Sequence, residues 1–172
     1  MLLRYLLTLV CAFGLFACKA DREQKNDKLK IWMSENGKKK VLCTTAQVAS
    51  LVEKVGGDAI ECLTLIQGEH DPHSYQLVKG DDEKFNRADL IFFSGLGLEH
   101  GPSLAYRLEH GKSAYSLGDY ILKTDPKSII YIDTTIDPHV WMDVSLWSKT
   151  IPFIVEELSK VLPDCKDEIK KN

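Results

Sequence analysis

Apolar runs and amphipathic segments alternate along the chain, and this alternation predicts strands and helices in turn. Short apolar, β-rich runs at 41–45, 60–66 and 90–93 are typical of strands. Residues 46–55 carry apolar side chains at helical spacing, and residues 79–88 predict a short charged helix. Strand, helix, strand, helix, strand is the pattern of a parallel sheet with right-handed crossovers.

Weaker signals extend this pattern into the second half of the chain. Residues 102–108 predict a helix, 114–117 a fourth strand and 129–132 a further strand, which we expect in the same sheet. The expected fold class is therefore α/β: one lobe with a parallel, roughly four-stranded sheet flanked by helices. In such sheets, ligands gather at the carboxyl ends of the strands.

A longer helical pattern occupies the last thirty residues or so, and two prolines divide it. The pattern begins at Trp141, and Pro152 either kinks the helix or opens its main portion. Pro163 interrupts the pattern again, and residues 164–172 resemble the opening turns of a new helix, with acidic residues early.

The N-terminus has the features of an export signal. Arg4 supplies a positive charge, and the apolar run at 6–16 is too short to span a bilayer. Cys18 follows a small residue at the end of this run, as in a bacterial lipobox, so we expect a signal peptide at 1–17, lipid on Cys18 and a polar tether at 18–39. The protein would then be exported and lipid-anchored, on the outer face of the cytoplasmic membrane or in the periplasm. An ordinary cleaved signal with a chance cysteine is the alternative.

Length and charge narrow the function classes. The chain has 172 residues, enough for one domain with a core and too few for two full α/β lobes. Its net charge is −3, and its basic residues are scattered, so no nucleic-acid partner is expected. Cys43 and Cys62 fall in predicted neighbouring strands, where either a disulfide in an oxidising compartment or two buried thiols would fit.

One motif, Asp-Pro-His, occurs twice, at 71–73 and at 137–139, each time after a predicted strand. Proline fixes its own φ and restricts the residue before it, so each histidine is held on a stiff loop. Imidazole is a good donor for zinc, manganese or iron, and its second nitrogen is usually oriented by a carboxylate or carbonyl. The candidate ligands are His73 and His139. The carboxylates that could orient them are Asp71, Asp137 and Asp143.

Short runs in a fixed order carry a family resemblance: TTAQ at 44–47, GEHDPHSY at 68–75, ADLIF at 88–92, GLGLE at 95–99 and DPHVWMD at 137–143. With the lipobox, they resemble the metal-specific (cluster A-I) solute-binding lipoproteins of ABC transporters, which carry zinc, manganese or iron. The resemblance implies that His73 and His139 are two ligands of a transported divalent metal, and that the partners are an ABC permease and its ATPase subunit.

The resemblance also implies how much of such a protein is present. The remaining ligands of the family come from a second lobe, which a long helix joins to the first. Residues 40–162 would be the N-terminal lobe and 163–172 the start of the linking helix, without the C-terminal lobe. A fragment whose single lobe does not hold metal tightly is a further hypothesis, because two imidazoles leave most coordination positions to water.

An enzyme is the remaining alternative. A metallohydrolase could use the same histidines with Asp71 or Glu69 as its base, but it needs a third ligand, and the sequence contains no HExxH, nucleophile elbow or P-loop. His70 is a candidate extra ligand that we expect to be a solvent-exposed loop residue instead. His100 and His110 are expected to be surface residues without a role.

Overall fold

The computed structural model describes residues 27–172, so the expected signal peptide and Cys18 lie outside the described residues. The chain divides into two units, with the boundary between Asn36 and Gly37. In the first unit, residues 27–33 are helical, within the segment expected to be a tether. No helix in the described part of the chain has the length and apolar character needed to cross a membrane.

The second unit is built on a parallel four-stranded sheet, as predicted. The strands are β1 (Lys39–Cys43), β2 (Ile60–Thr64), β3 (Leu90–Phe93) and β4 (Ala114–Ser116). Their order is β2-β1-β3-β4, and each neighbouring pair is parallel. The chain therefore moves to one side of β1 to form β2 and to the other side to form β3. This reversal creates a switch point at the carboxyl ends of β1 and β3, where doubly wound folds bind their ligands.

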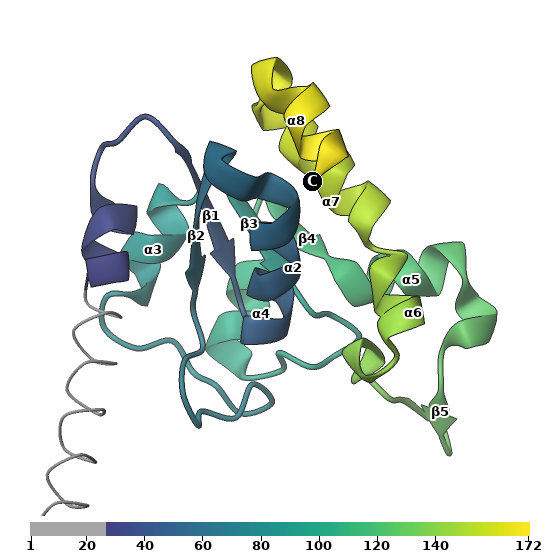
Figure 1. Ribbon diagram of the computed structural model, residues 1–172. Helices are drawn as coiled ribbons and strands as arrows, with labels where there is room; N and C mark the ends of the chain where they lie inside the picture. The colour runs from purple at the N-terminus through teal and green to yellow at the C-terminus, as the bar shows by residue number, and fades with distance from the viewer. Residues whose placement is uncertain (1–26) are drawn as a thin grey trace, which may run out of the picture. The chain divides into compact units, whose positions relative to one another are not determined.

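Helices cover both faces of the sheet. They are α2 (Ala46–Gly56), α3 (Asp81–Arg87), α4 (Pro102–Glu109), α5 (Leu117–Thr124), α6 (Val144–Ser148), α7 (Ile151–Val161) and α8 (Lys166–Lys171). One face of the sheet carries Val41, Cys43 and Phe92 and packs against α2, α5 and α7 in a continuous core. Figure 1 shows α2 in front of the strands, with α7 and α8 alongside it.

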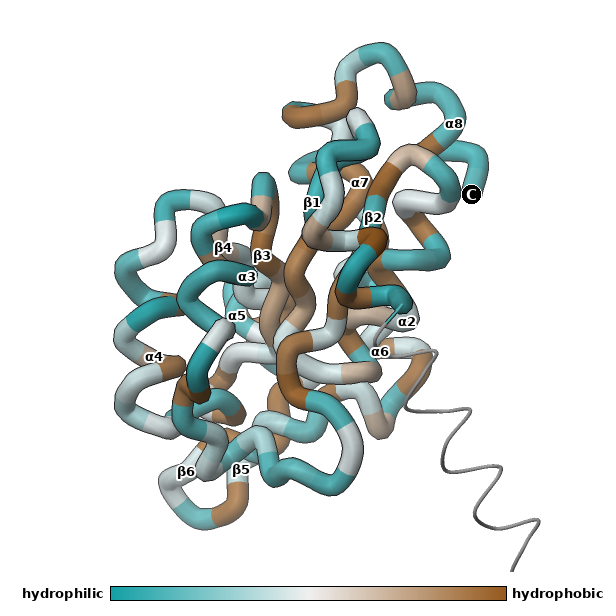
Figure 2. Tube along the Cα trace, turned by 90° about the vertical axis from the view of Figure 1, so that its left-hand side faces the viewer, coloured by the Kyte–Doolittle hydropathy of each residue, from teal (hydrophilic) through white to brown (hydrophobic). Residues whose placement is uncertain are grey.

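Residues that alternate with this core point to the opposite face of the sheet. Leu42 and Leu63 are fully buried there, and α3 lies against β1. In Figure 2 much of the central strands has the brown colour of hydrophobic residues, which is expected for parallel strands covered on both sides.

The long helical pattern from Trp141 is divided into separate helices. Asp143 caps α6 by accepting a hydrogen bond from the backbone N–H of Leu146 at 2.9 Å. Pro152 lies in the first turn of α7, so it opens that helix instead of kinking a longer one. After Pro163 the chain forms α8, as predicted.

The strand expected at 129–132 is not part of the main sheet, and this prediction was wrong. β5 (Tyr131–Ile132) pairs antiparallel with β6 (Thr135–Ile136) in a separate two-stranded hairpin. Its two-residue connection includes Asp133 at φ 55°, a left-handed conformation that aspartate tolerates in turns. The two short strands pair their backbone N–H and C=O groups with each other. The apolar run at 129–132 therefore does not need to join the four-stranded sheet to satisfy its backbone.

Cys43 and Cys62 lie on neighbouring strands, as expected. Both are buried, and their Sγ atoms are 3.5 Å apart, so the structure holds them as thiols and not as a disulfide.

Candidate metal centre

The first Asp-Pro-His motif lies in the loop between β2 and α3. The carboxylate of Asp71 accepts a hydrogen bond from the backbone N–H of His73 at 3.0 Å and another from the Ser74 hydroxyl at 2.8 Å. The Ser74 hydroxyl bond is the main cause that lowers the pKa of Asp71, followed by the bond from the His73 amide. Asp71 therefore fixes the backbone that carries His73 instead of touching its ring. With both oxygens committed to the turn, Asp71 is poorly placed as the base of a hydrolase.

The second motif, between β6 and α6, repeats this turn and adds a contact to the imidazole. Asp137 accepts a hydrogen bond from the His139 backbone N–H at 3.0 Å, and the same oxygen lies 2.6 Å from His139 Nδ1. The backbone bond is the larger cause that lowers the pKa of Asp137, and the imidazole bond follows. A carboxylate on Nδ1 places the hydrogen there and leaves the lone pair on Nε2, which is how metal-bound histidines are commonly oriented.

The two loops bring the imidazoles of His73 and His139 together across 66 residues of sequence. Their Nε2 atoms are 3.2 Å apart, and the ring centroids are 5.3 Å apart. Two nitrogens bound to one tetrahedral zinc ion lie about 3.4 Å from each other, given Zn–N distances of about 2.1 Å. The observed spacing therefore suits two ligands of one ion. The side chain of His139 is 44% exposed, so an ion there would be open to further donors.

The other carboxylates and histidines of the sequence analysis lie in different surroundings. Asp143, expected to orient a histidine, caps α6 instead. Glu69 and His70 are exposed, and the His70 and Tyr75 rings form a T-shaped pair. Among the described residues, no three His, Cys, Asp or Glu side chains stand together as a complete metal cluster. The geometry therefore brings together two of the predicted ligands and one of the carboxylates expected to orient them.

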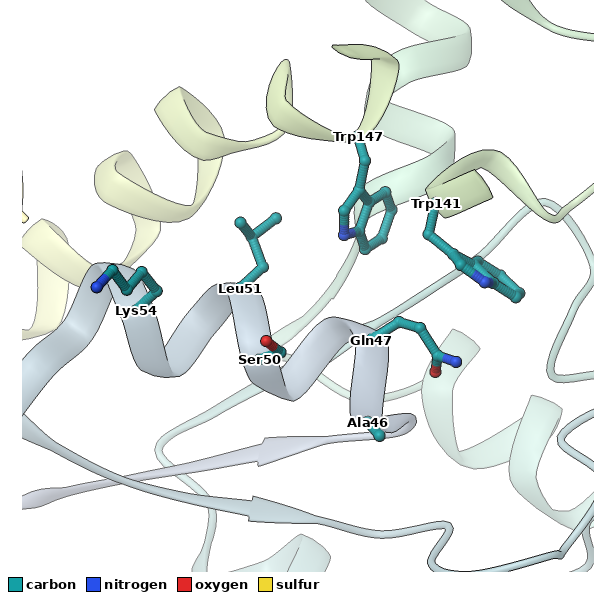
Figure 3. Close-up of a pocket in the computed structure, with 7 residues that line it drawn as sticks. All are labelled: Ala46, Gln47, Ser50, Leu51, Lys54, Trp141 and Trp147. Atoms are coloured by element: carbon teal, nitrogen blue, oxygen red, sulfur yellow. The ribbon is translucent and has the colours of Figure 1, made fainter. Parts of the chain in front are cut away.

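Trp141 packs next to His139, a contact that was not predicted from the sequence. The Trp141 ring meets the His139 ring edge-on at 5.2 Å between centroids. Trp141 also lines a pocket of about 550 Å³ with Trp147 and residues of α2, and Figure 3 shows the Trp147 indole pointing toward that helix and the Trp141 indole near the end of the Gln47 side chain. His139 also borders a smaller pocket of about 280 Å³, whose lining includes the exposed Met142. The position of Trp141 two residues after His139 is the only sequence signal for this contact.

His100 also lies close to the predicted ligands. It lies in the loop between β3 and α4, and its ring centroid is 5.4 Å from that of His73. It is exposed, as expected for a surface residue. Its place beside the site was not predicted. His110, by contrast, stacks on Tyr106 at the end of α4.

A buried carboxylate supports the loop that carries His100. Glu99 is 5% exposed and accepts three hydrogen bonds: from the Thr44 hydroxyl at 2.6 Å, the Ser94 N–H at 2.8 Å and the Gly95 N–H at 3.0 Å. These bonds join the end of β1 to the loop after β3, at the switch point of the sheet. Gly95 has φ 79°, and a Cβ there would lie 1.8 Å from the Ser116 hydroxyl, so the loop requires glycine.

Comparison with known proteins shows the family of the chain. Residues 41–172 match the family described as "Zinc-uptake complex component A periplasmic" (ZnuA). The chain belongs to this family. Relatives of the chain are described as metal-binding proteins or as substrate-binding lipoproteins of metal ABC transporters, so at the level of the family the chain groups with binding proteins and not with enzymes.

Relatives within the ZnuA family are about twice as long as this chain. Metal-binding protein YtgA of Chlamydia trachomatis serovar D is 30% identical over the whole chain, which spans 50% of YtgA. The manganese-binding lipoprotein MntA of Bacillus subtilis is 29% identical over 95% of the chain and 51% of MntA.

Solved structures of such proteins are likewise about twice as long as this chain. Fe(III)-bound YtgA from Chlamydia trachomatis superposes with a TM-score of 0.72 and 32% identity over 76% of this chain and 46% of YtgA. The periplasmic zinc-binding protein TroA from Treponema pallidum has a TM-score of 0.68 and 28% identity, over 76% of this chain and 47% of TroA. The chain therefore spans about half the length of the relatives that it matches.

Proposed function

We propose that this chain is the N-terminal lobe of an extracytoplasmic solute-binding protein that captures a divalent transition metal for an ABC importer. In this proposal His73 and His139 are ligands of the ion, and Asp137 holds the imidazole of His139 in the ligating orientation. The observation that carries the proposal is the 3.2 Å separation of the two Nε2 atoms on loops that are fixed by matching Asp-Pro-His turns.

The metal is zinc, manganese or iron in this proposal. Imidazole nitrogens suit all three, so these two ligands do not select among them. The names of the relatives support the same range of elements, because MntA is described as manganese-binding, TroA as zinc-binding and a YtgA structure as Fe(III)-bound, although Fe(III) is the trivalent form of iron. The remaining donors would come from a second lobe, since two nitrogens leave a tetrahedral or larger site incomplete.

The proposal assigns a role to each part of the chain. Residues 1–17 would direct export, and Cys18 would carry the lipid that anchors the protein through the tether at 18–39. Residues 40–162 would form the metal-binding lobe, and 163–172 would begin the helix that joins the lobes. The partners would be the permease and the ATPase of the importer, a proposal supported by relatives described as ABC transporter lipoproteins.

Titration calorimetry with Zn²⁺ and Mn²⁺ tests this function on the purified protein. We expect one site in the wild type and its loss in the double variant His73→Ala, His139→Ala, because both nitrogens would be removed. His110→Ala is the matched control, since it removes an exposed imidazole at the C-cap of α4 and should leave the binding isotherm unchanged. Undiminished binding by the double variant would refute the assignment of these ligands.

A further inference from the structure

The segment that follows His73 is tied to the N-terminal ends of two helices. The Tyr75 hydroxyl donates a hydrogen bond to the Asp81 carboxylate at 2.8 Å, and the backbone N–H of Val78 donates to the same oxygen at 2.9 Å. Asp81 is the first residue of α3, and its side chain is fully buried. A single carboxylate oxygen therefore holds both ends of the stretch 75–78 against the start of α3.

A second anchor for this segment comes from α4. The Ser103 hydroxyl, in the first turn of α4, donates a hydrogen bond to the Gln76 side chain at 2.8 Å and accepts one from the Leu77 N–H at 2.9 Å. Gly101 lies just before this helix, and a Cβ there would stand 2.0 Å from the Tyr75 carbonyl oxygen, so backbone packs directly on backbone at this point. The segment after the first Asp-Pro-His motif is thus held by both helices.

These anchors bear on the metal centre because His73 is placed through its backbone. On the N-terminal side, Asp71 accepts a hydrogen bond from the His73 N–H and fixes the turn. At the other histidine, Asp137 contacts the imidazole itself, so this contact orients the ring of His139. The 3.2 Å separation of the two Nε2 atoms therefore depends on how firmly the backbone after His73 is held as well.

We propose that Asp81 is a positioning residue of the metal centre, which acts through Tyr75 to hold the His73 imidazole in place for the ion. This inference rests on the proposed function. The role is geometric, because the Lys84 ammonium lies 2.8 Å from the other Asp81 oxygen and balances its charge. A loop that is already ordered loses less conformational freedom when the ion binds, so the anchor should raise the affinity for the ion.

Titration calorimetry with Zn²⁺ tests this role in two disruptive variants. Tyr75→Phe removes only the hydroxyl, and we expect the Zn²⁺ affinity to fall about ten-fold, at the lower end of the range for residues that orient a metal ligand. Asp81→Ala should cause at least the same loss, because it removes the acceptor of both hydrogen bonds. Adding Tyr75→Phe to Asp81→Ala should change the affinity little further, since both substitutions break the same bond.

Asp81→Asn is the conservative variant that separates geometry from charge. Its amide oxygen can still accept from Tyr75 and Val78, and its NH₂ group would face Lys84, which is 19% exposed and can turn to water. We expect Asp81→Asn to keep the Zn²⁺ affinity within about two-fold of the wild type. A loss as large as that of Asp81→Ala would show that the charge matters and would overturn the positioning role.

A control separates affinity from stability, and the outcomes separate this inference from the proposed function. Ile121→Val removes a buried methylene from α5, so it should lower Tm and leave the Zn²⁺ affinity unchanged. If Ile121→Val weakens binding as much as Tyr75→Phe does, the effect follows stability and the inference is wrong.

Wild-type affinity in Tyr75→Phe, combined with loss of binding in His73→Ala, would overturn the inference and leave the proposed function standing. If the wild type binds no Zn²⁺, the proposed function fails and this inference fails with it. Should Asp81→Ala not fold, Tyr75→Phe alone decides, because it retains the packed ring.

Discussion

Replacing Glu99 with glutamine tests whether its buried carboxylate organises the switch point of the sheet. One carboxylate oxygen accepts from the Thr44 hydroxyl and the Ser94 amide, and the other accepts from the Gly95 amide. A carboxylate can accept at both oxygens, whereas an amide accepts at one side and donates at the other. In Glu99→Gln the side-chain NH₂ would therefore face at least one N–H or O–H donor.

The size of the effect follows from this mismatch. Leaving one buried donor without an acceptor costs about 1–3 kcal/mol, and Glu99 is 5% exposed, so water offers little compensation. For a chain of this size, each kcal/mol corresponds to a shift in Tm of roughly 3 °C. We expect Glu99→Gln to lower Tm by roughly 3–9 °C.

Thermal unfolding followed by circular dichroism measures this shift, with Glu109→Gln as the control. Glu109 is the last residue of α4 and is exposed, so its neutralisation should change stability by less than about 0.5 kcal/mol. A Tm for Glu99→Gln within about 1 °C of the wild type would refute the argument that the three hydrogen bonds hold the loop.

Four further predictions concern the residues at and beside the site. Asp137→Ala should weaken Zn²⁺ binding by about 10–100-fold in calorimetry, because His139 loses its orienting partner. Asp143→Ala should instead lower the unfolding free energy by about 0.5–2 kcal/mol in urea and spare the affinity, because Asp143 caps α6. The pKa of Asp137 is lowered in the folded state, so its carboxylate should stabilise the fold above its unfolded-state pKa. This contribution should vanish as the pH falls through the folded-state pKa. The unfolding free energy of Asp137→Asn should therefore change less with pH in the acid range than that of the wild type. Zn²⁺ should change tryptophan emission through Trp141, which contacts His139, so Trp141→Phe should abolish the change and Trp147→Phe should retain it.

The parallel sheet could be predicted because its strands are short, apolar and separated by amphipathic helices. The two histidines could be predicted because each lies in a motif that is complete within three residues. The Asp71 and Asp137 turns form from local hydrogen bonds, so their geometry does not depend on distant parts of the chain.

The remaining features depend on contacts between distant residues or on competition between local structures. Residues 129–132 are as apolar as a buried strand, but a nearby turn at Asp133 lets them pair locally. His100 is an ordinary surface residue in the sequence, and only the sheet order brings it beside His73. Glu99 likewise gains its role from Thr44, which is 55 residues away.

The imidazoles around His73 are carried by connections between elements, whereas most of the buried side chains that hold the unit together belong to the strands and helices. If these imidazoles bind the metal as proposed, they can be exchanged at little cost to the folded state, in contrast to ligands that also pack the interior of a protein. Relatives that are named for different metals are the expected product of such freedom: selectivity can change from one ion to another while the scaffold stays the same.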